Sequence, residues 1–209
     1  MKKIILFSFF INAFYFLYPQ TKLAKDKVYN RIDSIKIANP DSVFNVVIGF
    51  TDHVTSIPKC LFKLKNLRNL TIVCYSKNLE YSNYVKKIPK KITQLNKLRK
   101  LTFVHASIGN IPAYICKLDS LEELTFGWCK VESIPETIGE LQNLKRIEIE
   151  NNGSDTMKSI PASIKNLKKM QFFMIVGCYF KNDSIIAYKE RLPEKCYKNF
   201  GAAIDCGCK

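Results

Sequence analysis

The segment IPAYICKLDSLEELTFGWCKV, residues 111–131, contains two apolar periodicities in succession. From Ile111 to Leu121 the apolar side chains recur every three or four residues, and at Leu124 and Phe126 they recur every second residue. A step of three or four is typical of a helical turn, and a step of two is typical of a strand. The segment therefore predicts a short helical element that leads into a strand whose Leu124 and Phe126 side chains face inward.

The same pattern occurs five times, each copy opening with Ile-Pro, and apolar residues follow each isoleucine by 4, 7, 10, 13 and 15 positions. A single copy has one apolar edge that it cannot bury alone. Copies stacked side by side align their strands into a parallel sheet and close a continuous core, so the pattern predicts a solenoid. The five copies begin at Ile57-Pro58, Ile88-Pro89, Ile111-Pro112, Ile134-Pro135 and Ile160-Pro161.

The repeat, Ile-Pro-x-x-Ile-x-x-Leu-x-x-Leu-x-x-Leu-x-Leu-x-x-Asn/Cys-x-Leu, resembles the leucine-rich repeat family in its short bacterial form of about 23 residues. The resemblance implies an α/β repeat fold, a leucine-rich repeat solenoid with a curved parallel β-sheet on its concave face and short helical or 3₁₀ segments on its convex face. A weaker strand at Val46 and Ile48 adds a sixth unit.

In the family, the Asn/Cys side chain of each turn bonds the loop backbone of adjacent turns. Here Tyr75 and Ala106 do not match that position, and we expect looser turns at both. Between about Tyr75 and Lys87 the chain also carries an insertion, which is either a solvated surface loop or a segment that helps to grip a partner. The six ladder positions are Thr51, Tyr75, Ala106, Cys129, Asn152 and Cys178.

The first residues differ from the repeats, because Lys2-Lys3 is followed by an apolar run from Ile4 to Tyr18. This layout is typical of a secretory signal peptide and is short for a membrane span. We expect residues 1–20 to be a signal peptide, 21–42 an N-terminal cap, 43–180 six leucine-rich repeats and 181–209 a cysteine-containing C-terminal cap. The mature chain is expected to be extracytoplasmic, secreted or periplasmic, with no transmembrane segment.

The chain has eight cysteines, and export favours disulfides. Cys196, Cys206 and Cys208 follow the last repeat, so we expect a cap closed by a disulfide from Cys196 to Cys206 or Cys208. Zinc binding by these three thiols is disfavoured, because the paired Cys-x-x-Cys spacing is missing. We expect Cys129 and Cys178 to be buried thiols, and we expect no metal and no cofactor.

The formal net charge is +15. Many lysines alternate with the apolar positions of the convex segments, which is typical of a solvated face but also attracts polyanionic glycan or lipid headgroups. No nucleic-acid motif is present, so nucleic acid is not an expected partner. These lysines are Lys59, Lys63, Lys65, Lys90, Lys91, Lys97, Lys165, Lys168 and Lys169.

Strand residues that alternate with the buried ones face the concave surface, together with the residue that flanks each strand end. Large aromatics dominate the energetics of interfaces, which favours a partner-binding site here. The alternative for Trp128, the only tryptophan, is that it packs against neighbouring turns and completes the core. The predicted partner-binding residues are Thr71, Val73, Thr102, Val104, His105, Thr125, Trp128, Arg146, Glu148, Glu150, Phe172 and Met174.

No pattern of catalytic residues is evident. His53 and His105 are the only histidines, and we find no Gly-rich phosphate loop, no metal-ligand helix and no nucleophile in a recognised setting. We therefore expect a non-enzymatic exported protein-protein interaction module that binds a protein or peptide on the concave sheet. The alternative is a binder of polyanionic glycan or lipid headgroups through the basic convex surface.

Overall fold

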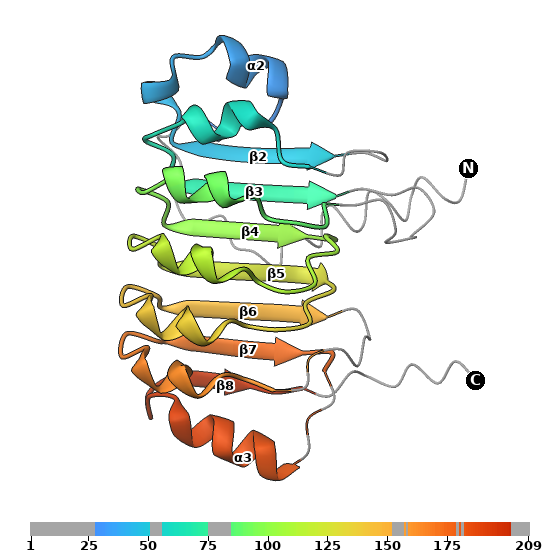
Figure 1. Ribbon diagram of the computed structural model, residues 1–209, viewed down its shortest axis with the longest axis vertical. Coiled ribbons are helices and arrows are strands. Elements are labelled where there is room, and N and C mark those ends of the chain that lie inside the picture. The colour runs from blue at the N-terminus through green and yellow to red at the C-terminus, as the bar shows by residue number, and fades with distance from the viewer. Residues whose placement is uncertain are drawn as a thin grey trace, which may run out of the picture.

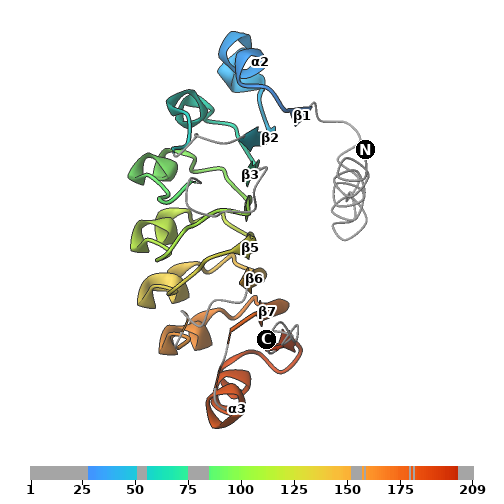
Figure 2. The same cartoon turned by 90° about the vertical axis from the view of Figure 1, so that its right-hand side faces the viewer.

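The computed structural model describes residues 28–50, 56–74, 85–151, 157, 159–178, 180 and 182–201. Within these ranges one sheet of eight parallel strands runs in chain order from β1 to β8. The strands stack along the long axis of the molecule (Figure 1). Seen along the strands, the sheet lies on one side and the 3₁₀ helices on the other (Figure 2). The predicted leucine-rich repeat solenoid with a curved parallel sheet is confirmed.

Six strands, β2 to β7, are the ones that the repeat predicts, and equivalent positions pair across them. Leu101 pairs with Leu124 and Phe103 with Phe126. The strands are β1 Val28–Tyr29, β2 Asn45–Phe50, β3 Asn69–Cys74, β4 Lys100–Val104, β5 Glu123–Cys129, β6 Arg146–Asn151, β7 Phe172–Val176 and β8 Tyr197–Asn199.

A short 3₁₀ helix follows the proline of each Ile-Pro pair. In residues 111–131 the Ile115 amide donates to the Pro112 carbonyl at 2.9 Å, the Leu118 amide to the Ile115 carbonyl at 3.0 Å and the Leu121 amide to the Leu118 carbonyl at 2.8 Å. A 3₁₀ helix has three residues per turn, so bonds of this kind bring every third side chain to the same side. The helices are η2 Lys59–Lys63, η4 Lys90–Gln94, η5 Ala113–Lys117, η6 Glu136–Glu140 and η7 Ala162–Asn166.

The core lies between the sheet and the 3₁₀ helices and continues from turn to turn. Phe103 and Phe126 stack in it with ring centroids 5.6 Å apart and an interplanar angle of 7°. Burial of one large apolar side chain contributes roughly 1.5–3 kcal/mol, and here each turn supplies several. Turns also approach closely on the convex side, where a methyl group on Gly139 would lie 2.5 Å from the Ser163 carbonyl oxygen.

Helices close both ends of the solenoid. The N-terminal end carries α2 Ile32–Ile37 and a 3₁₀ turn, η1 Pro40–Ser42, and the C-terminal end carries α3 Asn182–Arg191. These helices lie within the segments 21–42 and 181–209, which were expected from the sequence to be caps. The strands β1 and β8 were not expected, and they extend the sheet at its two edges.

Strand β8 belongs to a shortened repeat. The Cys196 amide donates to the Pro193 carbonyl at 3.0 Å, as the Ile164 amide donates to Pro161 in the preceding unit. The chain then enters the sheet at once, because the Tyr197 amide bonds the Gln171 carbonyl at 2.9 Å. The last unit therefore keeps the proline turn of the repeat and omits the rest of its convex segment.

The ladder position at Ala106 differs from the expectation. Ala106 is fully buried, and its amide donates to the Cys129 sulfur at 3.4 Å. Its carbonyl accepts from the Lys130 amide at 3.1 Å. The expected looser turn at Ala106 is thus wrong, because the cysteine of the following turn supplies the missing side-chain contact. The other expected loose turn, at Tyr75, lies outside the described residues.

Several other sequence predictions fall outside the ranges that the structure describes. These are the signal peptide, residues 75–84 of the insertion, Thr51, His53, Asn152, and the cysteines Cys206 and Cys208. In the part of the chain that is described, no helix combines the length and the apolar character needed to cross a membrane.

Candidate functional site

The face of the sheet opposite the 3₁₀ helices carries one side chain from the start of each strand from β2 to β8. These residues pair from strand to strand and form a continuous row across the sheet. The row is amide-rich at β2 and β3, charged at β4 to β6, and aromatic at β7 and β8. Its members are Asn45, Asn69, Lys100, Glu123, Arg146, Phe172 and Tyr197.

The last three members form a stack, which we call the Arg–aromatic cluster: Arg146, Phe172 and Tyr197. The guanidinium carbon of Arg146 lies 3.7 Å from the centroid of the Phe172 ring. The Phe172 ring stacks on Tyr197 with centroids 4.9 Å apart and an interplanar angle of 17°. Tyr197 is 54% exposed, so the outer side of the stack is open to a ligand.

A carboxylate orients the arginine of this cluster. The Nε and Nη2 groups of Arg146 donate to one oxygen of Glu148 at 3.0 and 2.8 Å. Glu148 is only 5% exposed, and hydrogen bonds between charged groups are stronger than neutral ones. The pair holds the guanidinium over the Phe172 ring.

Glu150 lies two residues further along β6, opposite Val176 of β7. Burial raises the pKa of its carboxyl group, and the nearby Glu148 charge raises it further. Near the carboxyl end of β6, the concave face therefore contains a carboxyl group that accepts a proton more readily than an exposed glutamate does.

Trp128 lies near the end of β5, and His105 directly follows β4. Both have left-handed backbones, with φ of 52° and 55°, a conformation that glycine adopts most easily. The β5–β6 register shifts between Phe126 and Cys129, so Trp128 sits in a bulge that turns it out of the strand. Trp128 is 51% exposed, which shows that its interpretation as a core residue is wrong.

The His105 and Trp128 rings face each other across neighbouring turns, with centroids 6.3 Å apart. Burial lowers the pKa of the His105 imidazole, so the neutral ring is favoured near neutral pH. The pair presents an aromatic surface without a fixed charge at the carboxyl ends of the strands.

None of the other predicted partner-binding residues is exposed. Thr71, Thr102 and Met174 are half-buried, and Val73, Val104 and Thr125 are buried. Neither valine belongs to the continuous core cluster, as expected for side chains on the concave face. The structure thus brings predicted residues together in two regions, Arg146 and Phe172 in the Arg–aromatic cluster and His105 with Trp128 at the ends of β4 and β5.

Tyr197 was missed from the sequence, although a signal for it exists. Leu192-Pro193 and Cys196 reproduce the start of the Ile-Pro-x-x-Ile pattern, and Tyr197 follows Phe172 by nearly one repeat length. The ion pair between Lys100 and Glu123, with 2.7 Å between the ammonium and a carboxylate oxygen, was also missed. Lys100 and Glu123 occupy equivalent positions of neighbouring repeats, and their opposite charges would have indicated the ion pair.

Among the described cysteines, Cys60, Cys74, Cys116, Cys129 and Cys196 are free thiols. Burial raises the pKa of the Cys196 thiol, whose sulfur lies 3.3 Å from the Tyr197 carbonyl oxygen. The predicted partners of Cys196 lie outside the described ranges, so the cap disulfide stays a prediction. Within the same ranges, no group of three His, Cys, Asp or Glu residues is placed to hold a metal ion.

Stacked turns of 3₁₀ helix and parallel strand define a solenoid repeat protein. A family model described as a leucine-rich repeat region matches residues 79–194. Because this span is more than half of the 209 residues, the chain belongs to the leucine-rich repeat family. No curated protein matches the sequence.

Three solved structures are similar to this chain. An internalin of Listeria monocytogenes is 14% identical, with a TM-score of 0.52, and the match covers 85% of this chain and 54% of the internalin. A leucine-rich repeat protein of Leptospira interrogans is 20% identical, with a TM-score of 0.33 and coverages of 74% and 54%. A plant peptide hormone receptor, solved in complex with RGF2, is 20% identical, with a TM-score of 0.43 and coverages of 66% and 24%. The chain thus spans about half the length of the two bacterial proteins, and at 14% identity the likeness to the internalin is one of fold.

Proposed function

We propose that the protein is a non-enzymatic interaction module that binds a protein or peptide on its concave face. The observation that carries this proposal is the Arg–aromatic cluster. Arginine and tyrosine are enriched among the residues that dominate binding energy at protein interfaces. Here Arg146 lies on β6 and Tyr197 on β8, on either side of Phe172 in β7, and Tyr197 is more than half exposed.

The cluster needs little rearrangement before a partner binds. Two charge-assisted hydrogen bonds fix Arg146 to Glu148, and the Phe172 ring is held between Arg146 and Tyr197. Ordering a flexible side chain at an interface costs about 0.5–1.5 kcal/mol, and a preformed stack reduces that cost. The open face of Tyr197 suits an apolar or aromatic side chain of the partner.

The His105–Trp128 pair supplies a second contact region on the same molecule. An exposed tryptophan beside a neutral imidazole favours an apolar contact, since neither ring carries a charge that must be desolvated. A partner that crosses the sheet from β5 to β8 would contact both regions.

We further propose that this binding takes place outside the cytoplasm. The support is the basic start and apolar run of residues 1–20, which has the layout of a signal peptide. Expression of the full chain in a bacterial host, followed by mass determination of the extracytoplasmic product, tests the point. A product that keeps residues 1–20 or stays in the cytoplasm would contradict it.

The binding proposal is tested by comparative capture from extracellular extract, using the full chain and two variants. Tyr197→Ala removes the exposed face of the cluster. Ile186→Ala is the matched control, because Ile186 is a similarly exposed apolar residue on α3, outside the concave row. We expect a partner identified with the unaltered chain and with Ile186→Ala to be lost with Tyr197→Ala. Equal recovery with all three proteins would exclude the cluster as the binding site.

A further inference from the structure

We propose that the outer surface of the first two Ile-Pro turns is a binding site for a linear sulfated or carboxylated polysaccharide. This surface, the basic strip, shares no residue with the concave site. A failed test of polysaccharide binding would therefore leave the proposed protein binding on the concave face unaffected, and the reverse also holds. The basic strip consists of Lys59, Lys63, Lys65, Arg68, Lys90, Lys91, Lys97 and Arg99.

Charge is distributed very unevenly over the five equivalent turns. Counting the thirteen residues from each Ile-Pro isoleucine, residues 57–69 have four Lys or Arg and no Asp or Glu, and residues 88–100 have five and none. Residues 111–123 have one basic and three acidic residues, residues 134–146 have two of each, and residues 160–172 have three basic residues and none acidic. The net charges are therefore +4, +5, −2, 0 and +3. A face that serves only to keep the protein in solution does not require positive charge to be concentrated on particular turns.

The charges of the basic strip are exposed and largely uncompensated. All eight side chains are exposed. Among the described residues only Arg99 has an acidic partner, Glu122, at 3.6 Å, and this Arg99 side chain is itself 60% exposed. Exposed pairs of this kind contribute little. A cluster of positive charges with few acidic neighbours attracts a polyanion, so this surface favours a polyanionic ligand.

Contacts between the two turns bring their basic residues side by side. The Lys97 ammonium donates to the Asn66 side-chain oxygen at 2.7 Å, and the Arg99 amide donates to the Arg68 carbonyl at 2.7 Å. Arg68 is in turn placed over the Phe44 ring, with its guanidinium carbon 5.1 Å from the centroid. The strip is thus one connected surface of two adjacent turns.

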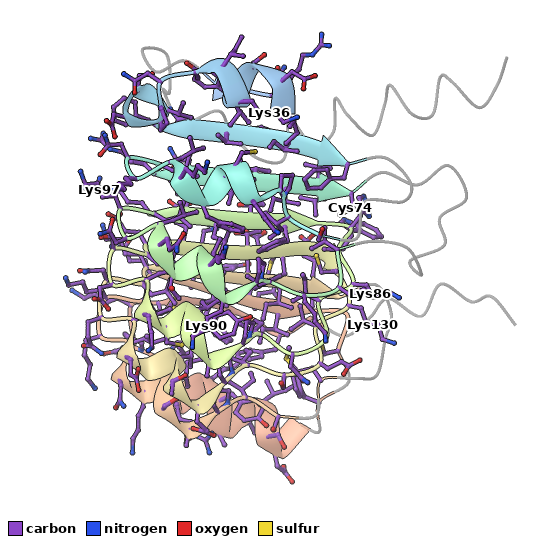
Figure 3. All side chains as sticks on the ribbon, turned by 45° about the horizontal axis from the view of Figure 1, so that its top comes forward. Lys36, Cys74, Lys86, Lys90, Lys97 and Lys130 are labelled. Carbon is purple, nitrogen blue, oxygen red and sulfur yellow. The ribbon has the colours of Figure 1, made fainter. Side chains whose placement is uncertain are left out.

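The shape of the strip distinguishes among polyanions. Figure 3 shows Lys90 on the convex 3₁₀ helix and Lys97 on the rim at which the strands begin, so the strip bends around the molecule. A flat bilayer touches one side of such a surface only. Moreover, the large exposed apolar residues of the described chain, which would anchor it in a membrane, all lie elsewhere: Ile37, Val47, Trp128, Ile186 and Tyr197.

Nucleic acid fits less well for a related reason. Proteins that bind single strands combine a basic groove with aromatic side chains on which bases stack. In the basic strip the neighbouring aromatic Phe62 is buried, and Phe44 is covered by Arg68. A hydrated polysaccharide with sulfate or carboxylate groups along a flexible chain requires only ammonium and guanidinium donors and can follow the bend.

The test is direct binding of the full chain to a heparin oligosaccharide, with phosphatidylglycerol vesicles and single-stranded oligothymidylate as competing ligands. The strip variant is Lys59→Gln, Lys90→Gln, Lys91→Gln. The matched control is Lys165→Gln, Lys168→Gln, Lys169→Gln, which removes three exposed charges from the turn of η7. Both variants change the net charge equally and only at exposed positions, and circular dichroism and urea denaturation verify that each is folded.

We expect the strip variant to bind heparin roughly 10- to 100-fold more weakly than the unaltered chain at low ionic strength, and the control to change far less. Heparin binding should also weaken steeply as salt rises. An equal loss in both variants would show that only net charge matters and would overturn the proposal. Tighter binding to the vesicles or the oligonucleotide than to heparin, or no binding to heparin at low salt, would overturn it as well.

Discussion

The guanidinium carbon of Arg146 lies 3.7 Å from the centroid of the Phe172 ring, and the Nε and Nη2 groups of the same side chain donate to Glu148. Arg146 and Phe172 are paired positions of neighbouring strands. The contact therefore follows from the register of the repeat, whereas Glu148 comes from the same strand two residues later. One residue thus links the stability of β6 to the proposed binding surface of β7 and β8.

Removing this arginine should destabilise the fold. Arg146→Ala leaves the nearly buried Glu148 carboxylate without its donor, and we expect the free energy of unfolding to fall by about 1–3 kcal/mol. Urea denaturation at neutral pH measures the change. The double variant Arg146→Ala, Glu148→Gln should be more stable than Arg146→Ala alone, because the stranded charge is gone. No difference between the single and double variants would show that the pair does not contribute.

Close packing between turns gives a second prediction. In Gly139→Ala the new methyl group would meet the Ser163 carbonyl oxygen at 2.5 Å and the Ser163 Cβ at 3.0 Å, so the backbone of η6 or η7 must shift. Overpacking of this kind typically costs about 1–3 kcal/mol. The control is Gly109→Ala, whose methyl group would meet only the Glu132 side chain, at 3.6 Å. Urea denaturation of both variants should show a loss of stability at residue 139 and little change at residue 109; equal effects would refute the steric explanation.

The repeat predicted most of the fold because its spacing has a direct mechanical cause. Hydrogen bonds such as that from the Leu118 amide to the Ile115 carbonyl impose the three-residue step. The two-residue step of Leu124 and Phe126 then requires a strand. Any chain with this pattern must stack its turns to bury the resulting stripe, so strand order, register and the convex helices follow together.

Features that depend on single departures from the repeat were harder to predict. Strand β8 was missed because its unit passes from the Pro193 turn into the sheet within four residues, without the leucines that mark the other copies. The closed turn at Ala106 depends on Cys129 of the next unit, which supplies the contact that Ala106 lacks. The exposure of Trp128 depends on a left-handed backbone conformation. Such a conformation is usually indicated by a glycine in the sequence, so a tryptophan gives no sign of it.

The left-handed backbone of Trp128 leads to a prediction about alanine and glycine at this position. Alanine is ordinarily more favourable than glycine in a strand, but at φ of 52° the order should reverse. We expect Trp128→Gly to be about 1 kcal/mol more stable than Trp128→Ala. At Thr102, within β4, the same pair of substitutions should show the ordinary order. Urea denaturation of the four variants provides the comparison, and a more stable alanine variant at residue 128 would mean that the turn relaxes when the indole is removed.

The last prediction concerns the dependence of stability on pH at Glu150. Its pKa is raised in the folded protein by burial and by the Glu148 charge, so the folded state takes up a proton at a higher pH than the unfolded state. A group of this kind opposes folding when it is ionised, and the opposition disappears as pH falls through the folded pKa. Relative to Glu150→Gln, which does not titrate, the unaltered chain should therefore be less stable at neutral pH and should gain stability as pH falls towards the ordinary range of glutamate. Urea denaturation of both proteins over this interval measures the difference, which removes the contribution of titrating groups that do not interact with Glu150. A difference that stays constant with pH would show that the Glu150 carboxyl group titrates alike in the folded and unfolded chain.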